Sequence, residues 1–289
     1  MTPRSIGADA IFEQRRPAMT GLAYRMLGSR AEAEDVVQDA WLRWRKVDVA
    51  EVEEPGAYLN RVVARLAMDR LKSARARREI YVGEWLPEPV VEPDFEAGGD
   101  ADLSVAFLLA LERLTPLERA AFLLHDVFDT PFAEVAAALG RSETACRQLA
   151  SRAREHVRRD RPRYAPSVDE ERRLTTAFLQ AVMTGDEVAL RDLLAEDVVM
   201  HADGGGLVSA NLNPVKGLAK AVALITGVRR KWPPPEGTVV RLARINGQPG
   251  LVLSADGIVF QTVGLEIEAG RIAAVYTMRN PEKLRGVAQ

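Results

Sequence analysis

The hydrophobic periodicity of this 289-residue chain changes once along its length, and that change limits the folds it can adopt. Up to about residue 159 the apolar residues recur at helical spacing, with short breaks. After the proline-containing stretch 161–166, helical segments give way to β-type segments separated by turns such as Asn246-Gly247 and Asp256-Gly257. Helices first and hairpins afterwards indicate an α+β domain that follows all-helical domains.

The composition excludes several classes of protein. Hydrophobic residues make up 47% of the chain, enough to bury cores, and the net charge of −2 gives no indication of nucleic acid, so the distribution of charge must decide. Cys146 is the only cysteine, which excludes an internal disulfide and a multi-cysteine metal site, and we expect it to be a small buried residue. Without a secretion signal or an apolar run of about 18 residues, we expect a cytoplasmic protein with no membrane segment, metal or cofactor.

The breaks in the pattern predict four segments. They are a helical domain at 1–83, an acidic linker rich in Pro and Gly at 84–101, a second helical domain at 102–163, and the α+β domain at 164–289. In the last domain we predict helices at about 169–184, 187–195 and 217–231, and strands at 238–245, 250–253, 258–268 and 271–278.

The first helical domain contains a helix with two distinct faces, at about 33–44. Its aromatic face, which we expect to be core, holds Val37, Trp41 and Trp44. A polar strip lies elsewhere on the helix and comprises Asp35, Gln38, Asp39 and Leu42. This strip is free to meet a partner, although a solvated surface is the more common explanation of an acidic helix face.

The next helix, at about 57–78, carries a basic stripe. Its members recur at successive turns as Arg61, Arg65, Met68, Lys72 and Arg75, extended by Arg77 and Arg78. Asp69 is the only acidic residue before Glu79, so the local field is positive although the chain is not. Such a stripe suits a phosphate backbone. A solvated face and an acidic protein partner remain alternatives.

The second helical domain contains a helix-turn-helix pattern. A short amphipathic helix at Phe132–Leu139 is followed by Gly140, which permits a tight turn, and by a second helix to about Arg159. The buried face of the second helix is predicted to hold Ala145, Leu149, Ala153 and Val157. The exposed face has the residue types that contact phosphates and base edges, namely Arg147, Gln148, Ser151, Arg154 and Arg158. A plain helical hairpin is the alternative.

These two domains resemble the sigma-70 family, and in particular its extracytoplasmic-function branch. Glu34–Leu42 and Leu66–Leu71 are similar to region 2, and Leu114–Arg119 with the helix-turn-helix is similar to region 4. The resemblance implies an alternative sigma factor, whose partners are promoter DNA and core RNA polymerase, contacted at the β′ clamp helices and the β flap. It implies that the clamp helices meet Asp35, Gln38, Asp39, Leu42 and Arg43.

The same resemblance implies which helices read the promoter. The helix Arg61–Arg78, Arg70 included, opens and reads the −10 element, and the helix Thr144–Arg158 reads the −35 element. The acidic linker between the two domains then threads near the RNA exit path of the polymerase.

The resemblance extends to a subgroup whose members carry a SnoaL-like domain of the nuclear-transport-factor-2 fold, an α+β cone. Tyr81–Pro89 and the C-terminal Asn280–Leu284 are similar to marks of that subgroup, and Asp203–Gly206 resembles its glycine-rich motif, although Leu207 stands where a lysine is usual. The subgroup is thought to regulate itself through the attached domain. The regulatory residues it implies are Asp203, Gly204, Gly205, Gly206, Asn280, Pro281, Glu282, Lys283 and Leu284.

Two other functions are open from the residues alone. Folds of this kind often enclose a pocket, so a ligand-sensing or enzymatic protein could use His201 and Asp203 to move a proton, and an unknown small-molecule ligand remains conceivable. The segment His201–Asp203 is equally typical of a strand that enters a glycine turn, with Asp203 bonding the backbone, and we expect no enzyme. A dimeric helix-turn-helix repressor, the third function, would bind DNA without polymerase.

Overall fold

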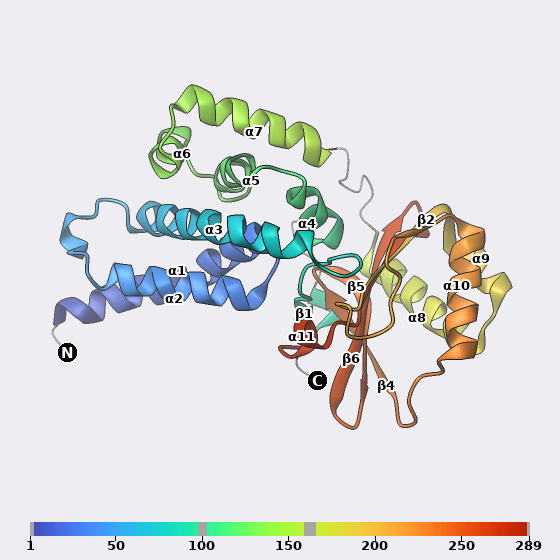
Figure 1. The fold of residues 1–289 in the computed structure, drawn as a ribbon. Coiled ribbons are helices and arrows are strands. Elements are labelled where there is room, and N and C mark those ends of the chain that lie inside the picture. The colour runs from blue at the N-terminus through green and yellow to red at the C-terminus, as the bar shows by residue number, and fades with distance from the viewer. Residues whose placement is uncertain (1–2, 98–102, 159–165, 288–289) are drawn as a thin grey trace. The chain divides into compact units, whose positions relative to one another are not determined.

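Figure 1 shows the computed structural model of the chain, which describes residues 3–97, 103–158 and 166–287. The chain forms two compact units. One joins the helices up to Glu79 with those that follow Ala106, and the other joins Ile80–Val105 with the C-terminal domain. The predicted linker is therefore part of the C-terminal unit.

The helical unit covers Met1–Glu79 and Ala106–Arg161, whereas the two helical domains are predicted at 1–83 and 102–163. Its helices are α1 (Pro3–Leu27), α2 (Arg30–Trp44), α3 (Pro55–Glu79), α4 (Val105–Glu112), α5 (Pro116–Phe122), the π-turn η4 (Leu123–Val127), α6 (Phe132–Leu139) and α7 (Glu143–Arg158). Local chemistry fixes several ends. Ser29 caps α2 by accepting from the Glu32 amide, and Thr115 and Glu118 form a reciprocal capping box at α5.

The core of α1–α3 is built around the aromatic face of α2. Trp44 is fully buried and donates its indole N–H to the carbonyl of Ala8 in α1, at 2.9 Å. Trp41 is half-buried and packs on Phe12, with ring centroids 4.9 Å apart. The predicted aromatic core is thus confirmed, and it fixes which face of α2 points outward.

A buried ion cluster ties four helices of this unit together. Arg119 of α5 is fully buried and donates to the carbonyl of Met26 and to Glu112 Oε1, both at 2.7 Å. Arg78, at the end of α3, donates to the other oxygen of Glu112 and to the carbonyl of Leu27. Burial acts to raise the pKa of Glu112, but the charges of the two arginines outweigh it and lower that pKa.

The C-terminal unit is a seven-stranded sheet with helices. Its elements are β1 (Val91–Glu92), η2 (Phe95–Ala97), α8 (Val168–Thr184), α9 (Glu187–Leu193), β2 (Leu194–Asp203), β3 (Val215–Lys216), α10 (Leu218–Lys231), β4 (Val239–Ile245), β5 (Gln248–Ala255), β6 (Ile258–Glu268), β7 (Arg271–Met278) and α11 (Pro281–Leu284). The strand order is β1-β4-β5-β6-β7-β2-β3, and β2 pairs parallel to β7 while the other neighbours are antiparallel. The predicted α+β domain is confirmed.

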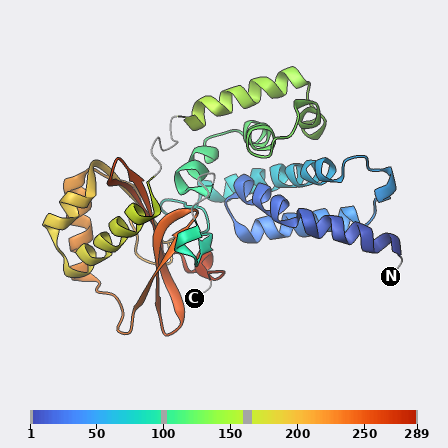
Figure 2. The same cartoon turned by 180° about the vertical axis from the view of Figure 1, so that it is seen from behind.

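The two faces of this sheet have different covers, as Figures 1 and 2 show. On one face, α8, α9 and α10 enclose the hydrophobic core, which includes Phe178, Met200 and Leu218. The segment Ile80–Glu96 is here called the strap; its first part lies on the other face together with α11, and its last residues, Phe95 and Glu96, contact Arg172 of α8. Within the strap, β1 extends the sheet by pairing with β4, and the Val90 carbonyl accepts from the Asn246 amide at 2.8 Å.

We predict that Glu112→Gln destabilises the helical unit by about 3 kcal/mol, because the buried Arg78 and Arg119 would lose the negative charge of the carboxylate they share. Urea unfolding followed by far-UV circular dichroism measures this. In the folded protein the pKa of Glu112 lies below its ordinary value of 4.5. Ionised Glu112 therefore stabilises the folded state fully above about pH 4.5, and this stabilisation is lost as the pH falls through the lowered pKa. Glu143→Gln, which removes an exposed i, i+4 pair with Arg147, is the matched control and should change the free energy of unfolding by less than about 0.5 kcal/mol. Equal losses in the two variants would contradict the role of Glu112.

Candidate functional site

The outward face of α2 holds the residues predicted to meet the polymerase. Because α2 buries Ala33, Val36, Val37, Ala40 and Trp44, the opposite side is left in solvent. That side is here called the α2 face and holds Asp35, Gln38, Asp39, Leu42 and Arg43. Leu42 is 50% exposed, an apolar side chain amid polar ones. The structure therefore brings this predicted set together on one surface.

Arg70 reaches the α2 face from the neighbouring helix α3. Its Nη1 donates to Asp35 Oδ2 at 2.9 Å, and its Nη2 donates to Asp39 Oδ2 at 3.0 Å. The family resemblance assigns Arg70 to the helix that reads DNA. Its side chain instead lies with the acidic residues of α2, because the helical turn that carries it points toward α2 and away from the basic stripe.

The basic stripe of α3 is divided in the structure. Arg61, half-buried over the ring of Tyr58, and the exposed Lys72 remain at the surface. Arg65 donates to the carbonyls of Ala137 and Ala138 at the end of α6, both at 2.7 Å. The side chains of Arg75 and Arg77 lie outside the described residues.

Arg78 departs from the predicted stripe. Its side chain is 15% exposed and is committed to Glu112 in the buried ion cluster. This corrects its assignment as a DNA-binding residue, because the end of α3 turns its last arginine inward, toward α4, where a carboxylate needs a counter-charge.

The helix-turn-helix forms as predicted. Gly140 ends α6 in the left-handed conformation, with φ 62° and ψ 44°, and α7 follows after a short turn. The buried face of α7 is rotated from the prediction, because Cys146 and Ala150 are buried while Ala145 and Leu149 are only half-buried. Cys146 is confirmed as a buried small residue, and burial raises the pKa of its thiol.

The outward face of α7 carries the predicted DNA-reading residues. Those exposed to solvent are Thr144, Arg147, Gln148, Ser151 and Arg158. Arg154 is partly covered because it pairs with Asp126 of η4. An amphipathic helix with cations and amides outward, supported by a second helix, has the shape that fits a DNA groove.

Asp203 is the centre of a buried polar site in the C-terminal unit. Its side chain is fully buried at the end of β2. Oδ1 accepts from the Tyr81 hydroxyl at 2.6 Å and from the Gly205 amide at 3.0 Å. Oδ2 accepts from the Leu86 amide at 2.9 Å and from Lys283 Nζ at 2.7 Å. One carboxylate thus joins the strap, the glycine loop and the C-terminal segment.

The loop after Asp203 requires glycines because neighbouring atoms leave no room for a side chain. A Cβ on Gly204 would lie 2.3 Å from the carbonyl oxygen of Val208. Gly205 and Gly206 have φ of +63° and +71°, and a Cβ on either would overlap Asn280 or Val82 respectively. The loop therefore lets the strap and the C-terminal segment approach the sheet. Leu207, which follows, is exposed.

The C-terminal segment is held by its first and fourth residues. Asn280 caps α11 by accepting from the Glu282 amide, and its Nδ2 donates to the Tyr81 hydroxyl at 2.7 Å. Pro281 occupies the first turn, and Leu284 is buried. Lys283 donates also to the carbonyl of Leu86 at 2.6 Å.

The rings of Tyr81 and Trp85 complete the surroundings of the Lys283 ammonium. Nζ lies 4.9 Å from the Tyr81 ring centroid and 4.4 Å from that of Trp85. Burial, followed by the bond to Asp203, raises the pKa of Tyr81, so its phenol stays protonated and continues to donate. Motifs that lie about 200 residues apart in sequence therefore form a single site, which is here called the Asp203 site.

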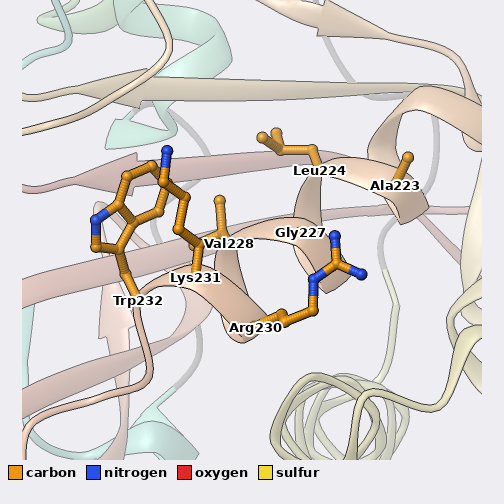
Figure 3. Close-up of a pocket in the computed structure, with 7 residues that line it drawn as sticks. All are labelled: Ala223, Leu224, Gly227, Val228, Arg230, Lys231 and Trp232. Atoms are coloured by element: carbon orange, nitrogen blue, oxygen red, sulfur yellow. The ribbon is translucent and has the colours of Figure 1, made fainter.

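The geometry does not favour proton transfer by His201 and Asp203. His201 lies on the strap side of the sheet, bonded to Glu84 at 2.6 Å and stacked on Tyr276, while Asp203 is occupied by four donors. A hollow in this domain lies instead on the outer side of α10, with Gly227, Val228 and Trp232 in its lining (Figure 3). Its lining contains no acidic residue or histidine, so it cannot supply the proposed acid and base.

Sequence reasoning missed the partners of several residues. It named the segment Tyr81–Pro89 only as a family mark, and it did not predict that Tyr81, Leu86 and Lys283 meet at Asp203. It also missed the pairing of Arg70 with α2. An acidic residue directly before three glycines was the one local signal of a constrained site.

Comparison with known proteins gives consistent matches along the chain. The Sigma-70 region 2 family matches residues 11–77, and the Sigma-70 region 4 family matches residues 104–157. The ECF RNA polymerase sigma factor SigJ of Mycobacterium tuberculosis is 38% identical, over 95% of this chain and 92% of that protein. The probable ECF RNA polymerase sigma factor SigI of the same species is 31% identical, over 96% of this chain and 94% of that one.

Solved structures give the same match. The crystal structure of M. tuberculosis SigJ superposes with a TM-score of 0.77 at 34% identity, covering 95% of this chain and 97% of that one. Within the described residues, no helix is both long and apolar enough to cross a bilayer.

We predict that Asp203→Asn loosens the strap, because the amide places an NH₂ group against donors and removes the carboxylate charge that pairs with Lys283. Amide hydrogen exchange in Ile80–Val90 should accelerate about 100-fold, equivalent to about 3 kcal/mol. The matched control is Asp256→Asn, in an exposed turn where asparagine accepts the same positive φ of 49°. Exchange of the strap that is no faster in Asp203→Asn than in this control would refute the account of the site.

Proposed function

Because this chain belongs to the extracytoplasmic-function sigma factors of the sigma-70 family, we propose that its α2 face docks on core RNA polymerase while α3 and α7 read promoter DNA. Sigma factors bind core RNA polymerase and promoter DNA, and this chain is an alternative sigma factor rather than an enzyme. One observation supports these assignments: the helical unit carries an acidic-polar face on α2, and its exposed basic residues lie on other helices, α3 and α7.

The α2 face suits a partner with cationic side chains, such as the clamp helices of the β′ subunit. Asp35 and Asp39 supply the charge that attracts and orients such a partner, and the half-exposed Leu42 supplies an apolar anchor that gains affinity when it is buried. The helical segment that carries α7 is assigned to the β flap, which would hold α7 over the −35 element.

The DNA contacts divide by chemistry. Arg61 and Lys72 of α3 are assigned to the −10 element, where they meet phosphates. On α7, Arg147 and Gln148 stand near the N-terminal end of the helix, from which guanine and adenine edges are read, and Arg158 stands near the other end to meet a phosphate. Phosphate contacts set the register and base contacts set the promoter sequence.

We expect Leu42→Asp and Arg147→Ala to separate the two activities. Leu42→Asp should raise the dissociation constant for core polymerase at least about tenfold, since it places an unpaired charge in the interface. Arg147→Ala should leave that constant unchanged and reduce promoter-specific transcription at saturating protein about fivefold to 100-fold. Binding to labelled core polymerase and single-round transcription measure the two effects. If Leu42→Asp binds core as tightly as wild type, the α2 face is not the docking surface.

The C-terminal domain is assigned a regulatory role in cis. The strap belongs to the segment that connects α3 with α4, and hence the two DNA-reading regions. While Asp203, Asn280 and Lys283 hold the strap on the sheet, that segment cannot extend along the RNA exit path. Regulation then consists of holding or releasing the strap, which determines whether the segment between α3 and α4 can extend.

We expect Lys283→Ala, and a chain that ends before Asn280, to transcribe more at limiting protein than wild type, because a released strap allows the segment between α3 and α4 to extend along the RNA exit path. Multiple-round transcription from one cognate promoter measures the change. Lys220→Ala, an exposed lysine of α10, is the control and should behave as wild type. Unchanged transcription in both altered chains would count against regulation through the strap.

A further inference from the structure

Arg70 binds two carboxylates that the sequence pattern places on a different functional surface. Asp35 and Asp39 are one helical turn apart on α2, and each gives one oxygen to a different nitrogen of the same guanidinium, at 2.9 and 3.0 Å. The two carboxylate side chains remain 69% and 44% exposed. A partner can therefore still reach both of them while Arg70 holds them.

Two carboxylates at i and i+4 repel each other and, left alone, would swing apart among several rotamers. A planar guanidinium placed between them removes the repulsion and fixes both orientations at once, which a lysine cannot do because its ammonium is a single point of charge. Arg70 is itself held in place, because α3 buries Ala67, Leu71 and Ala74 on either side of it.

The surroundings of Arg70 do not suit a phosphate. Both terminal nitrogens of Arg70 already donate to carboxylates that offset its charge, so Arg70 attracts a DNA phosphate less than an arginine without such partners would. Lys72, two residues further along α3, is different: its side chain is 71% exposed and pairs with Asp69, itself 76% exposed, through a bond that solvent screens. Two neighbouring cations of one helix therefore differ in how far their charge is offset by carboxylates.

We propose that Arg70 is a positioning residue of the polymerase-binding surface, which presents Asp35 and Asp39 as a preorganised pair to two cationic side chains on core RNA polymerase. The inference rests on the proposed docking of the α2 face. The partner should present two cationic groups about 5–6 Å apart, which is the spacing of side chains one turn apart on a helix. Preorganisation gains affinity because the carboxylates lose less freedom on binding.

The test compares Arg70→Gln and Arg70→Lys with Lys72→Gln in the full-length chain, using binding to core polymerase without DNA and single-round transcription at saturating protein. Both Arg70 variants should raise the dissociation constant for core about fivefold, and neither should lower transcription at saturation. Lys72→Gln should leave the dissociation constant for core unchanged and should lower transcription at saturation. Asp35→Asn should weaken core binding less in the Arg70→Gln background than in wild type, which a purely structural role for Arg70 would not produce.

Several outcomes overturn the inference. Core binding that is unchanged or tighter in Arg70→Gln would show that Arg70 does not prepare the surface, or that it competes with the polymerase. Unchanged core binding with reduced transcription at saturation would make Arg70 a DNA-reading residue. A wild-type chain that fails to bind core would instead refute the proposed function itself, so the two failures are distinguishable.

Discussion

The buried carboxylate of Asp203 is the interaction on which the architecture of the C-terminal unit depends. An ionised group removed from water is costly unless it is fully bonded, and Asp203 is bonded by two backbone amides, a phenol and an ammonium. Those donors come from the strap, the glycine loop and α11, so satisfying one side chain places three segments. The glycines follow from the same requirement, because any side chain at Gly205 or Gly206 would push Asn280 or Val82 away.

The helical unit uses a second buried carboxylate in a comparable way. Glu112 lies between two arginines, and the bonds of these arginines to the carbonyls of Met26 and Leu27 fix the end of α1 against α4 and α5. The regions that resemble sigma regions 2 and 4 therefore form one compact unit, joined also by the bonds of Arg65 to α6. The proposed docking and DNA-reading surfaces lie on α2, α3 and α7, and these bonds fix α3 against the neighbouring helices α1, α4, α5 and α6.

Local signals in the sequence were sufficient for part of this structure. Gly140 between two amphipathic segments predicted the helix-turn-helix, and the Asn246-Gly247 and Asp256-Gly257 turns predicted the hairpins. Only the end of β2, at His201–Asp203, was interpreted as a strand, because β2 follows α9 without a turn residue and its parallel pairing with β7 is a long-range contact. Helical periodicity placed Arg78 at the end of a basic stripe, and the family resemblance placed Arg70 in the DNA-reading helix, but neither could reveal that neighbouring helices present carboxylates to both arginines.

The most direct test of the central claim is run-off transcription with purified core polymerase on a library of genomic promoter fragments, with and without the full-length chain. If this protein is a sigma factor that brings the α2 face to the polymerase and α3 and α7 to the promoter, it will produce transcripts that start at defined positions and depend on its addition. If no fragment yields such a transcript, and core polymerase does not retain the protein, the account is wrong.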